Sequence, residues 1–292
     1  MAQAAVNGIT LEYEREGTGE PMLLIMGLGA QLTAWSPEFV ELLVGRGFEV
    51  IRHDNRDAGL STEMTGTPPS QRRAFTLRML GRPVDASYLI GDMADDAAAL
   101  LDDLEIESAH VVGVSMGGMI AQSLAIGHPE RVRSLTSIMS NPGDGSGLIS
   151  PKLALSMARR PTPTLDNAID LAVDTSRRIS GPHFDETVTR GRAVDAVARS
   201  FRPQGTVRQT AAIMASPNRV PGLQGLDTPT LVIHGLLDPL VRPSGGVRTA
   251  QAVPNSRLLM FNDMAHDLPA PRLGETADAI AQNASRVMSV RV

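Results

Sequence analysis

Short, mostly apolar runs recur along the chain and predict buried β-strands. The clearest lies at residues 21–27 (PMLLIMG), which is continuously apolar and ends in glycine, as expected of a strand covered on both faces. Further strands are predicted at residues 48–54, 110–115, 134–140, 230–235 and 257–261, although 48–54 and 134–140 contain more polar residues. Each has the length of a strand and is too short for a typical helix. The pattern therefore predicts a sheet with a largely buried interior.

Segments with apolar residues at helical spacing lie between these runs. Ser36, Pro37 and Glu38 supply a helix cap, a first-turn proline and an acid at the positive end of the helix dipole. The helix they open is expected to end near residue 45 or 47. Further helices are predicted at residues 85–104, 117–127 and 272–288. Strands that alternate with helices indicate an α/β protein, with a parallel sheet and helices on both faces.

The N-terminal residues predict a hairpin. Asn7-Gly8 is a strong two-residue turn signal between extended segments. Residues 11–16 then alternate between Leu, Tyr or Arg and glutamate. This alternation predicts an edge strand with one face in water.

Two segments interrupt the alternation of strands and helices. Residues 66–84 contain Pro68-Pro69 and four arginines, without a clear strand. Residues 141–203 are longer, helix-like and rich in proline. Between residues 151 and 203 there are nine basic and six acidic residues, so this segment has a net charge of +3. Because the whole chain has a net charge of -5, the remaining residues together carry -8. We expect a core domain of residues 1–140 and 204–292, and an inserted helical cap at residues 141–203.

Composition excludes several functional classes. The 292 residues are 42% hydrophobic with a net charge of -5, which does not fit a disordered chain. The absence of cysteine excludes a disulfide scaffold, a thiolate nucleophile and a Cys-ligated metal site. An acidic chain gives no reason to expect nucleic acid as a partner. No basic and apolar leader is present, and no apolar run approaches the roughly 20 residues that span a bilayer. A cytoplasmic protein without stable membrane insertion is expected.

The strongest chemical signal is the segment from Gly113 to Gly118 (GVSMGG), which directly follows a predicted strand and directly precedes a predicted helix. In this context G-x-S-x-G places Ser115 on a sharp turn, where its hydroxyl is exposed as a nucleophile. The Met116 N–H then lies at a helix N-terminus, where partial positive charge stabilises an oxyanion. The alternative is an ordinary glycine-rich turn with a buried serine.

A serine hydroxyl needs a base to accept its proton, and that base needs an orienting group. His266 lies in the loop FNDMAHDLP between the last strand and the last helix, which agrees with the chain order Ser…Asp…His of this kind of fold. Structural or surface roles are expected for the five other histidines: His53, His110, His128, His183 and His234.

The orienting acid is expected after another strand end, between the serine and the histidine. Asp238 directly follows the strand at residues 230–235 and is the first candidate, although Asp238-Pro239 also suits a simple turn. Asp144 follows the strand that ends near residue 140 and is its main rival. Asp263 and Asp267 are too close to His266 in sequence for the usual orienting role.

Glycines in the loop after the first buried strand suggest a second oxyanion donor. In Met26-Gly27-Leu28-Gly29 the backbone can turn its N–H inward, and the Leu28 N–H is the candidate. The segment 54–61 (DNRDAGLS) is interpreted as a structural turn beneath the site. Trp35 suits the pocket mouth and the core equally well.

Four arginines in the first interrupting segment could meet an anionic substrate, although a solvated basic loop is the favoured interpretation. They are Arg72, Arg73, Arg78 and Arg82.

These motifs resemble the α/β-hydrolase superfamily over nearly the whole chain outside the two insertions. LLIMGLGAQLTAW, HVVGVSMGGMIAQ, TLVIHGLLDPLV and the MAH of the last loop are similar to aclacinomycin methylesterase-like carboxylesterases and to related mycobacterial lipases. Many members carry histidine before the first glycine of the oxyanion loop, whereas Met26 stands here, as in the methylesterase-like group. The resemblance implies a mostly parallel eight-stranded sheet with an inserted cap. It also implies Ser115 as nucleophile, His266 as base, Asp238 as orienting acid, and the Leu28 and Met116 amides as oxyanion hole.

The resemblance thus implies a serine esterase that cleaves methyl or short to medium acyl esters of small hydrophobic molecules. The same triad serves thioesterases, lactonases, C–C bond hydrolases and cofactor-free perhydrolases, so these remain alternatives. A non-catalytic, receptor-like binding module is the alternative outside enzymes. The mechanism needs no metal or organic cofactor, and the expected partner is a small-molecule ester. A homodimer is left open.

Overall fold

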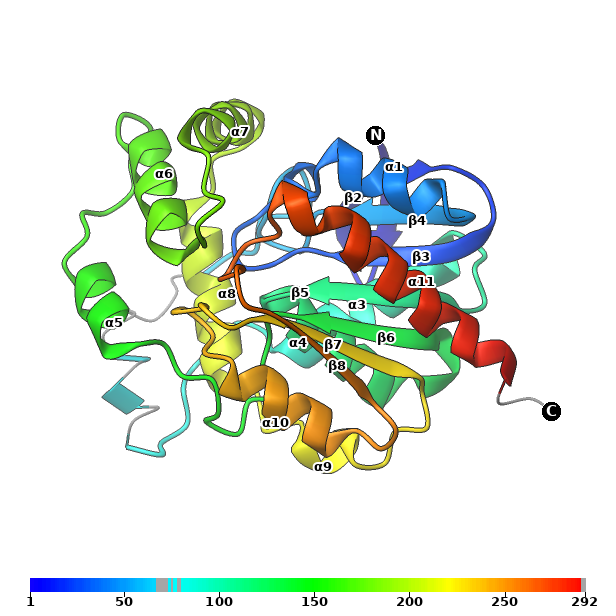
Figure 1. Cartoon of the computed structure of the whole chain (residues 1–292). Coiled ribbons are helices and arrows are strands. Elements are labelled where there is room, and N and C mark those ends of the chain that lie inside the picture. Colours follow the sequence, from blue (N-terminus) through cyan, green and yellow to red (C-terminus); the bar gives the residue numbers. More distant parts are fainter. Residues whose placement is uncertain (67–72, 75, 78–79, 290–292) are drawn as a thin grey trace.

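Eight strands form one sheet in the order β1-β2-β4-β3-β5-β6-β7-β8, with helices on both faces (Figure 1). The computed structural model describes residues 1–66, 73–74, 76–77 and 80–289. The strands are β1 (Ala2–Val6), β2 (Ile9–Glu16), β3 (Glu20–Ile25), β4 (Phe48–His53), β5 (Ala109–Val114), β6 (Val132–Ile138), β7 (Thr230–Gly235) and β8 (Arg257–Phe261). Strands β3 to β8 are parallel, and only the pairs β1–β2 and β2–β4 are antiparallel. The predicted mostly parallel α/β sheet is confirmed.

The hairpin at the N-terminus forms as predicted, but its second strand is not an edge strand. Asn7 and Gly8 both have positive φ, and Val6 pairs with Ile9 across the turn. Strand β2 pairs with β1 on one side and with β4 on the other, so β1 forms the edge. The prediction of an edge strand at residues 11–16 is therefore wrong. Alternation reports that one face of a strand is polar, and it does not report whether the backbone groups along its side are already paired.

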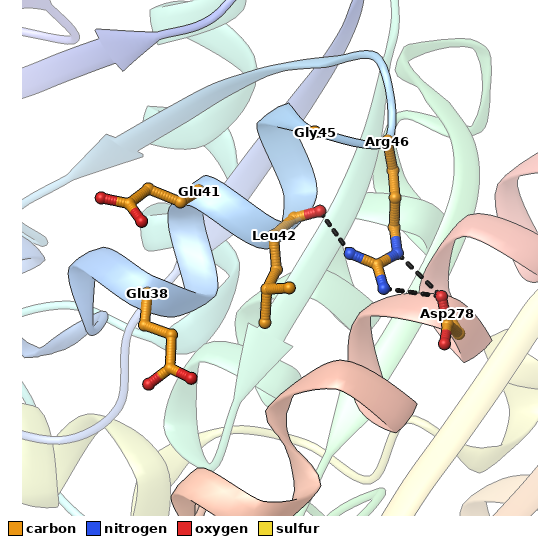
Figure 2. Close-up of a pocket in the computed structure, with 6 residues that line it drawn as sticks. All are labelled: Glu38, Glu41, Leu42, Gly45, Arg46 and Asp278. Atoms are coloured by element: carbon orange, nitrogen blue, oxygen red, sulfur yellow. Dashed lines mark hydrogen bonds and ion pairs between the residues drawn. The ribbon is translucent and has the colours of Figure 1, made fainter.

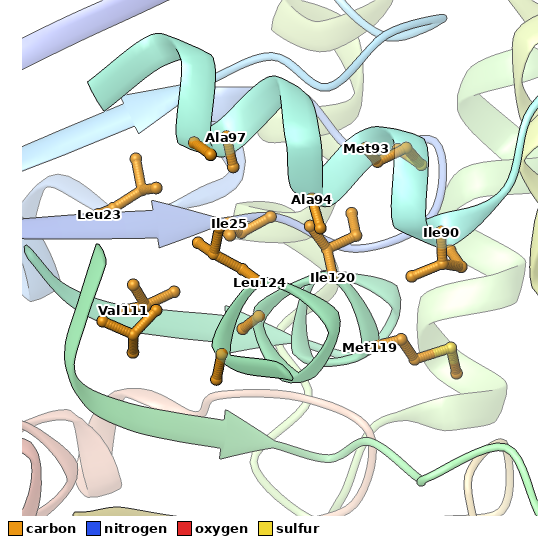
Figure 3. Packing of buried hydrophobic residues seen from close by; sticks show 14 of the residues in the cluster. Leu23, Ile25, Ile90, Met93, Ala94, Ala97, Val111, Met119, Ile120 and Leu124 are labelled. Carbon is orange, nitrogen blue, oxygen red and sulfur yellow. The ribbon is translucent and has the colours of Figure 1, made fainter. Parts of the chain in front are cut away.

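Each face of the sheet carries its own hydrophobic core, and β3 contributes to both. Leu23 and Ile25 pack beneath α3 (Ile90–Asp103) and α4 (Met116–Gly127), as Figure 3 shows. Met22 and Leu24 belong to the opposite core, beneath α1 (Pro37–Val44) and α11 (Leu273–Ser289). Successive side chains of a strand point to opposite faces, so a continuously apolar strand fits a position between two layers.

The predicted boundaries of α1 are confirmed, whereas the predicted start of α3 is wrong. Ser36 caps α1 as predicted, because its hydroxyl accepts from the Phe39 N–H, and the helix ends before Gly45. Helix α3 begins at Ile90, five residues after the predicted start at residue 85. Tyr88 is buried and donates its hydroxyl to the carboxylate of Asp57, and Leu89 is extended. These long-range contacts hold the chain extended where helical spacing alone predicted a helix.

Five helices lie between β6 and β7. They are α5 (Pro151–Ala158), α6 (Ala168–Ile179), α7 (Glu186–Arg199), α8 (Pro203–Ala215) and α9 (Val220–Leu223). In Figure 1, α5, α6 and α7 lie beyond one end of the sheet, and α8 lies between them and the strands. Other helices that the structure describes are α10 (Ser244–Ala252) and the short η1 (Leu32–Ala34), η2 (Pro129–Arg131) and η3 (Ala270–Arg272). The division into a core and a cap at residues 141–203 stays a prediction.

Candidate active site

Ser115 lies on a sharp turn between β5 and α4. Its backbone has φ 55° and ψ -118°, a conformation that is unfavourable for a residue with a side chain. The turn is tight because a Cβ on Gly113 would lie 2.1 Å from the Gly117 carbonyl oxygen. A Cβ on Gly117 would lie 2.0 Å from the Ile25 carbonyl oxygen. The two glycines therefore permit the close approach that places Ser115 at the carboxyl end of the sheet.

The side chains of Ser115, His266 and Asp238 form a continuous chain of hydrogen bonds. His266 Nε2 lies 3.0 Å from Ser115 Oγ, and His266 Nδ1 lies 2.7 Å from Asp238 Oδ2. Three loops that are distant in sequence meet here, each directly after a strand: β5, β7 and β8. The structure thus brings together all three side chains that were predicted to form the triad.

Asp238 is buried and surrounded by hydrogen-bond donors. Its Oδ1 accepts from the backbone N–H groups of Leu240 and Val241, at 2.8 and 2.9 Å. Burial by itself raises the pKa of this carboxyl, but hydrogen bonds from His234 and His266 outweigh burial and hold the pKa below its usual value. Asp238 is consequently an anion at neutral pH, as a group that orients and stabilises an imidazolium must be.

The rival acids make other contacts. Asp144 accepts from Ser146 and from Arg248 Nε at 2.8 Å. Asp263 pairs with Arg272 and His183, which lower its pKa to about 2. Neither Asp144 nor Asp263 hydrogen-bonds the His266 ring.

The other histidines bond to groups outside the triad, except for His234. His110 lies between Ser134 and Glu20, and His128 pairs with Asp95. His53 is buried, and burial lowers its pKa. His234, at the end of β7, bonds the Val241 carbonyl oxygen, and its Nε2 lies 3.4 Å from Asp238 Oδ2. His234 therefore supports the acid, a role that the sequence reasoning missed.

The two backbone N–H groups that were predicted to stabilise an oxyanion belong to residues that adjoin the nucleophile or its nearest neighbour. Gly27 lies directly against the nucleophile, because a Cβ there would be 3.2 Å from Ser115 Cβ. The Leu28 N–H follows Gly27, and the Met116 N–H follows Ser115 at the first position of α4. Among the residues that the structure describes, neither N–H has a hydrogen-bond acceptor. The two predicted oxyanion donors thus flank Ser115 from two different loops.

The segment 54–61 is fastened beneath the site by ion pairs that are largely buried. Arg199 Nη1 lies 2.7 Å from Asp54 Oδ2, and Arg56 Nε lies 2.6 Å from Asp96 Oδ2. Arg208 binds both oxygens of Asp57, which also accepts from the Tyr88 hydroxyl. The segment makes its charged contacts with α3, α7 and α8. This agrees with the structural role predicted for it.

Removing one partner of these pairs is expected to destabilise the fold. Arg208→Met leaves the Asp57 carboxylate buried without its cation and is expected to lower the free energy of unfolding by about 3–5 kcal/mol. Urea denaturation measures the change. The control is Arg190→Met, since the exposed Arg190–Asp170 pair contributes only about 0–1 kcal/mol. Equal effects of the two substitutions would contradict the role assigned to Arg208.

Trp35 belongs to the core. It is 2% exposed and stacks on Phe39, with ring centroids 5.7 Å apart. Of the four arginines in the first interrupting segment, Arg72 and Arg78 lie outside the described residues. Arg73 and Arg82 are described and exposed, and Arg73 lies on a helical turn rather than in a loop.

A surface hollow between α1 and α11 lies apart from the catalytic groups. Figure 2 shows its lining, in which Arg46 reaches across to Asp278 and the Leu42 carbonyl oxygen. Glu38 and Glu41 complete its polar side. The lining contains no nucleophile and no histidine, and the Arg46–Asp278 pair joins the two helices.

Neither a metal-binding cluster nor a membrane-spanning helix is found among the described residues. No three His, Asp or Glu side chains in this part of the chain form a group that could hold a metal ion. No described helix has both the length and the apolar character needed to cross a bilayer. The polar groups that do converge at the sheet edge are a hydroxyl, an imidazole and a carboxylate.

Comparison with known proteins gives the family. A model described as the alpha/beta hydrolase fold matches residues 20–270. The chain is 29% identical over 280 residues to the rhodomycin D methylesterase DnrP of Streptomyces peucetius, across 87% of this chain and 88% of that protein. It is 29% identical over 272 residues to a 2-hydroxymuconate semialdehyde hydrolase of Pseudomonas sp. (strain CF600), across 89% of this chain and 84% of that protein. The solved enol-lactonase from Burkholderia xenovorans LB400 is 24% identical, with a TM-score of 0.70, across 99% of this chain and 100% of that one.

These matches extend over most of the chain, and the methylesterase relative confirms the resemblance that the motifs indicated. The sheet order, the serine turn between β5 and α4, and the family model all agree. The chain belongs to the α/β-hydrolase family.

Proposed function

We propose that this protein is a carboxylic ester hydrolase that uses Ser115 as nucleophile, His266 as general base and Asp238 as orienting acid. The observation that carries the proposal is the hydrogen-bonded chain from Asp238 through His266 to the strained Ser115 turn. The methylesterase relative supports ester hydrolysis as the reaction. A serine at this turn forms an acyl-enzyme, so the reaction proceeds in two steps.

In the first step Ser115 Oγ forms a bond to the ester carbonyl carbon and gives its proton to His266 Nε2. The Leu28 and Met116 N–H groups donate to the developing oxyanion. The C–O bond to the alcohol then breaks, and the alcohol leaves with the proton from His266. Asp238 stabilises the imidazolium throughout. In the second step water attacks the acyl-enzyme, His266 accepts its proton and returns a proton to Ser115, and the carboxylic acid is released.

Partly exposed apolar side chains on the same loops support a small hydrophobic ester as substrate. Leu28 is 39% exposed, and Leu236 and Leu237, which directly precede Asp238, are 50% and 52% exposed. Burial of such side chains against a ligand is favourable in proportion to the apolar area removed from water. A methyl ester or a short to medium acyl ester of an apolar molecule fits this lining. The cap at residues 141–203 and a cytoplasmic location remain predictions from the sequence, and a homodimer remains open.

The folded wild-type protein is expected to react covalently with a fluorophosphonate probe at Ser115. The serine oxygen attacks the phosphorus of the probe and fluoride leaves, and this phosphonylation is fast only when a base activates the hydroxyl, so labelling separates an enzyme from a receptor-like binding module. Mass spectrometry of the tryptic peptide identifies the labelled residue. Absence of labelling in folded wild-type protein would overturn the serine-hydrolase proposal.

Other reactions on the same triad are distinguished by substrate. The relatives and structural neighbours include proteins named as a 2-hydroxymuconate semialdehyde hydrolase and as an enol-lactonase. We expect kcat/KM to be highest for p-nitrophenyl and methyl esters in a panel that also contains thioesters and lactones. A clear preference for lactones or thioesters would keep Ser115 as nucleophile and change the substrate class.

A further inference from the structure

The loop that carries the Leu28 N–H is fastened to α8 by one fully buried side chain, Gln209. The Gly29 N–H donates to Gln209 Oε1 at 2.8 Å. Gln209 Nε2 in turn donates to the Arg56 carbonyl oxygen, also at 2.8 Å. The side chain is 0% exposed. Gln209 therefore joins two loops that approach from different strands of the sheet, β3 and β4.

Helix α8 packs closely against both of these loops. A Cβ on Gly29 would lie 2.7 Å from Thr206 Oγ1, and a Cβ on Gly205 would lie 2.1 Å from the Asp57 carbonyl oxygen. The loop itself is closed by a hydrogen bond from the Ala30 N–H to the Gly27 carbonyl oxygen at 3.2 Å. The direction of the Gly29 N–H is thus determined by Gln209 within a loop that is already tightly turned.

The end of α7 holds Gln31, two residues further along the same loop. Gln31 Nε2 donates to the carbonyl oxygens of Ala196 and Ser200, and Gln31 Oε1 accepts from Arg199. The loop is therefore held at Gly29 and at Gln31 by helices that lie between β6 and β7. Gln209 is the contact nearest in sequence to the Leu28 N–H.

We propose that Gln209 is a positioning residue for the oxyanion hole: by fixing the Gly29 peptide it sets the direction of the adjacent Leu28 N–H toward the reacting carbonyl oxygen. This inference rests on the proposed function of Ser115 and Leu28. An N–H that stabilises an oxyanion must point at the position that the oxygen occupies in the transition state. Small errors in such positions are costly, because a displacement of about 1 Å can reduce a rate by about 100-fold.

The chemistry of this position requires an amide. One atom must accept from the Gly29 N–H while another donates to the Arg56 carbonyl oxygen, and an amide supplies both. An ionised carboxylate can only accept, so it would leave the Arg56 carbonyl oxygen unpaired. A methionine of similar length supplies neither bond. These differences give variants of nearly the same size with different hydrogen-bonding capacity.

Gln209→Met is expected to lower kcat for an activated ester by about 10- to 100-fold, with KM changed less than about threefold. Substrate binding in the ground state does not depend on the oxyanion donor, so the substitution is expected to lower kcat and to leave KM nearly unchanged. The matched control is Gln204→Met, since Gln204 is exposed on the first turn of the same helix. This control is expected to retain wild-type kcat and KM.

Gln209→Glu tests the hydrogen bonds directly. When protonated, a glutamic acid both accepts and donates, as the native amide does; when ionised, it cannot donate. Its kcat relative to wild type, measured at each pH, is therefore expected to rise as pH falls from about 8 to 5, because burial raises a carboxyl pKa. Protonation of His266 affects both proteins and cancels in the ratio. The charged side chains of the surrounding elements are already held in ion pairs: Asp54, Arg56, Asp57, Asp96, Arg199 and Arg208.

The outcomes separate this inference from the proposed function. An unlabelled and inactive wild-type protein would overturn the function itself. An active wild-type protein with Gln209→Met at wild-type kcat would overturn the positioning role alone. If Gln209→Met does not fold, the pH dependence of Gln209→Glu decides: a ratio that rises at low pH supports the role, and a flat ratio contradicts it.

Discussion

Replacement of Ser115 by alanine is expected to lower kcat for an activated p-nitrophenyl ester by about four to six orders of magnitude. The hydroxyl is the atom that forms the acyl-enzyme, and no cysteine is present in the chain to substitute for it. The remaining N–H groups and binding contacts would still give a small acceleration over water. Steady-state kinetics, corrected for spontaneous hydrolysis of the ester, measure the loss.

A matched control is available on the helix that follows the nucleophile. Ser123 lies on α4, is partly buried and makes no part of the triad. Ser123→Ala is expected to keep wild-type kcat, because alanine is at least as favourable in a helix interior. Comparable losses in both variants would show that the effect of Ser115→Ala comes from misfolding of α4.

His266→Ala is expected to match the loss of Ser115→Ala, because the two side chains act as one unit. A double variant should be no slower than either single variant, as expected of groups that depend on each other. If His266→Ala retained near wild-type activity, His266 would not be the base. The loop after β8 would then need another role.

Much of the fold could be predicted because the sheet is buried on both faces. Strand β3 is apolar from Pro21 to Ile25 because it contacts both cores, and this produces a clear apolar run in the sequence. Boundaries that depend on distant contacts could not be predicted. Helix α3 begins at Ile90, where Asp92 accepts from the Leu89 N–H, and the preceding Tyr88 bonds Asp57, a partner 31 residues away. The place of β2 within the sheet depends on β1 filling its open side.

The three polar side chains of the site could be identified because each lies directly after a strand. In a parallel sheet the carboxyl ends of the strands meet at one edge, so residues in three separate loops converge there. The choice between Asp238 and Asp144 could not be made with certainty from the sequence, since both follow strands. The structure distinguishes them by their partners, which are His266 for Asp238 and Arg248 for Asp144.

The residues that support the site gave no signal in the sequence. Gln209 bonds Gly29 across 180 positions, and nothing near residue 209 marks it as different from any helical glutamine. His234 resembles any polar residue at the end of a strand, and its contact with Asp238 appears only when the loop after β7 folds back. Such roles arise from tertiary contacts rather than from local patterns.

The helices between β6 and β7 contact the loop that carries Leu28 and the loop that carries His266. Gln209 and Arg199 hold the loop of Leu28, and the Ile179 carbonyl oxygen accepts from the His266 N–H at 2.8 Å. Asp267 accepts from the N–H groups of Gly181 and Ala265, and burial raises the pKa of this carboxyl. Substitutions in these helices are therefore expected to change kcat without touching the substrate.

Asp238→Asn is expected to lower kcat by about 10⁴-fold, with the fold preserved. Asp238 Oδ1 accepts two backbone N–H groups, so an asparagine would keep its carbonyl oxygen there and turn its NH₂ toward His266 Nδ1. The ring nitrogen Nδ1 must then accept, which places the proton of the neutral imidazole on Nε2. In that tautomer His266 cannot take the proton of Ser115, and the imidazolium also loses its neighbouring anion.

Asp144→Asn is the matched control for this charge change. Asp144 also follows a sheet strand and is also held by hydrogen bonds, but its partners are Ser146 and Arg248. Its substitution removes the ion pair with Arg248, whose side chain is 37% exposed, and is expected to leave kcat within about twofold of wild type because such pairs contribute little. Steady-state kinetics over pH 6–9 compare the two variants. The reverse result, with Asp144→Asn crippled and Asp238→Asn nearly normal, would transfer the orienting role to Asp144 and require a rearrangement of the loop after β6 during turnover.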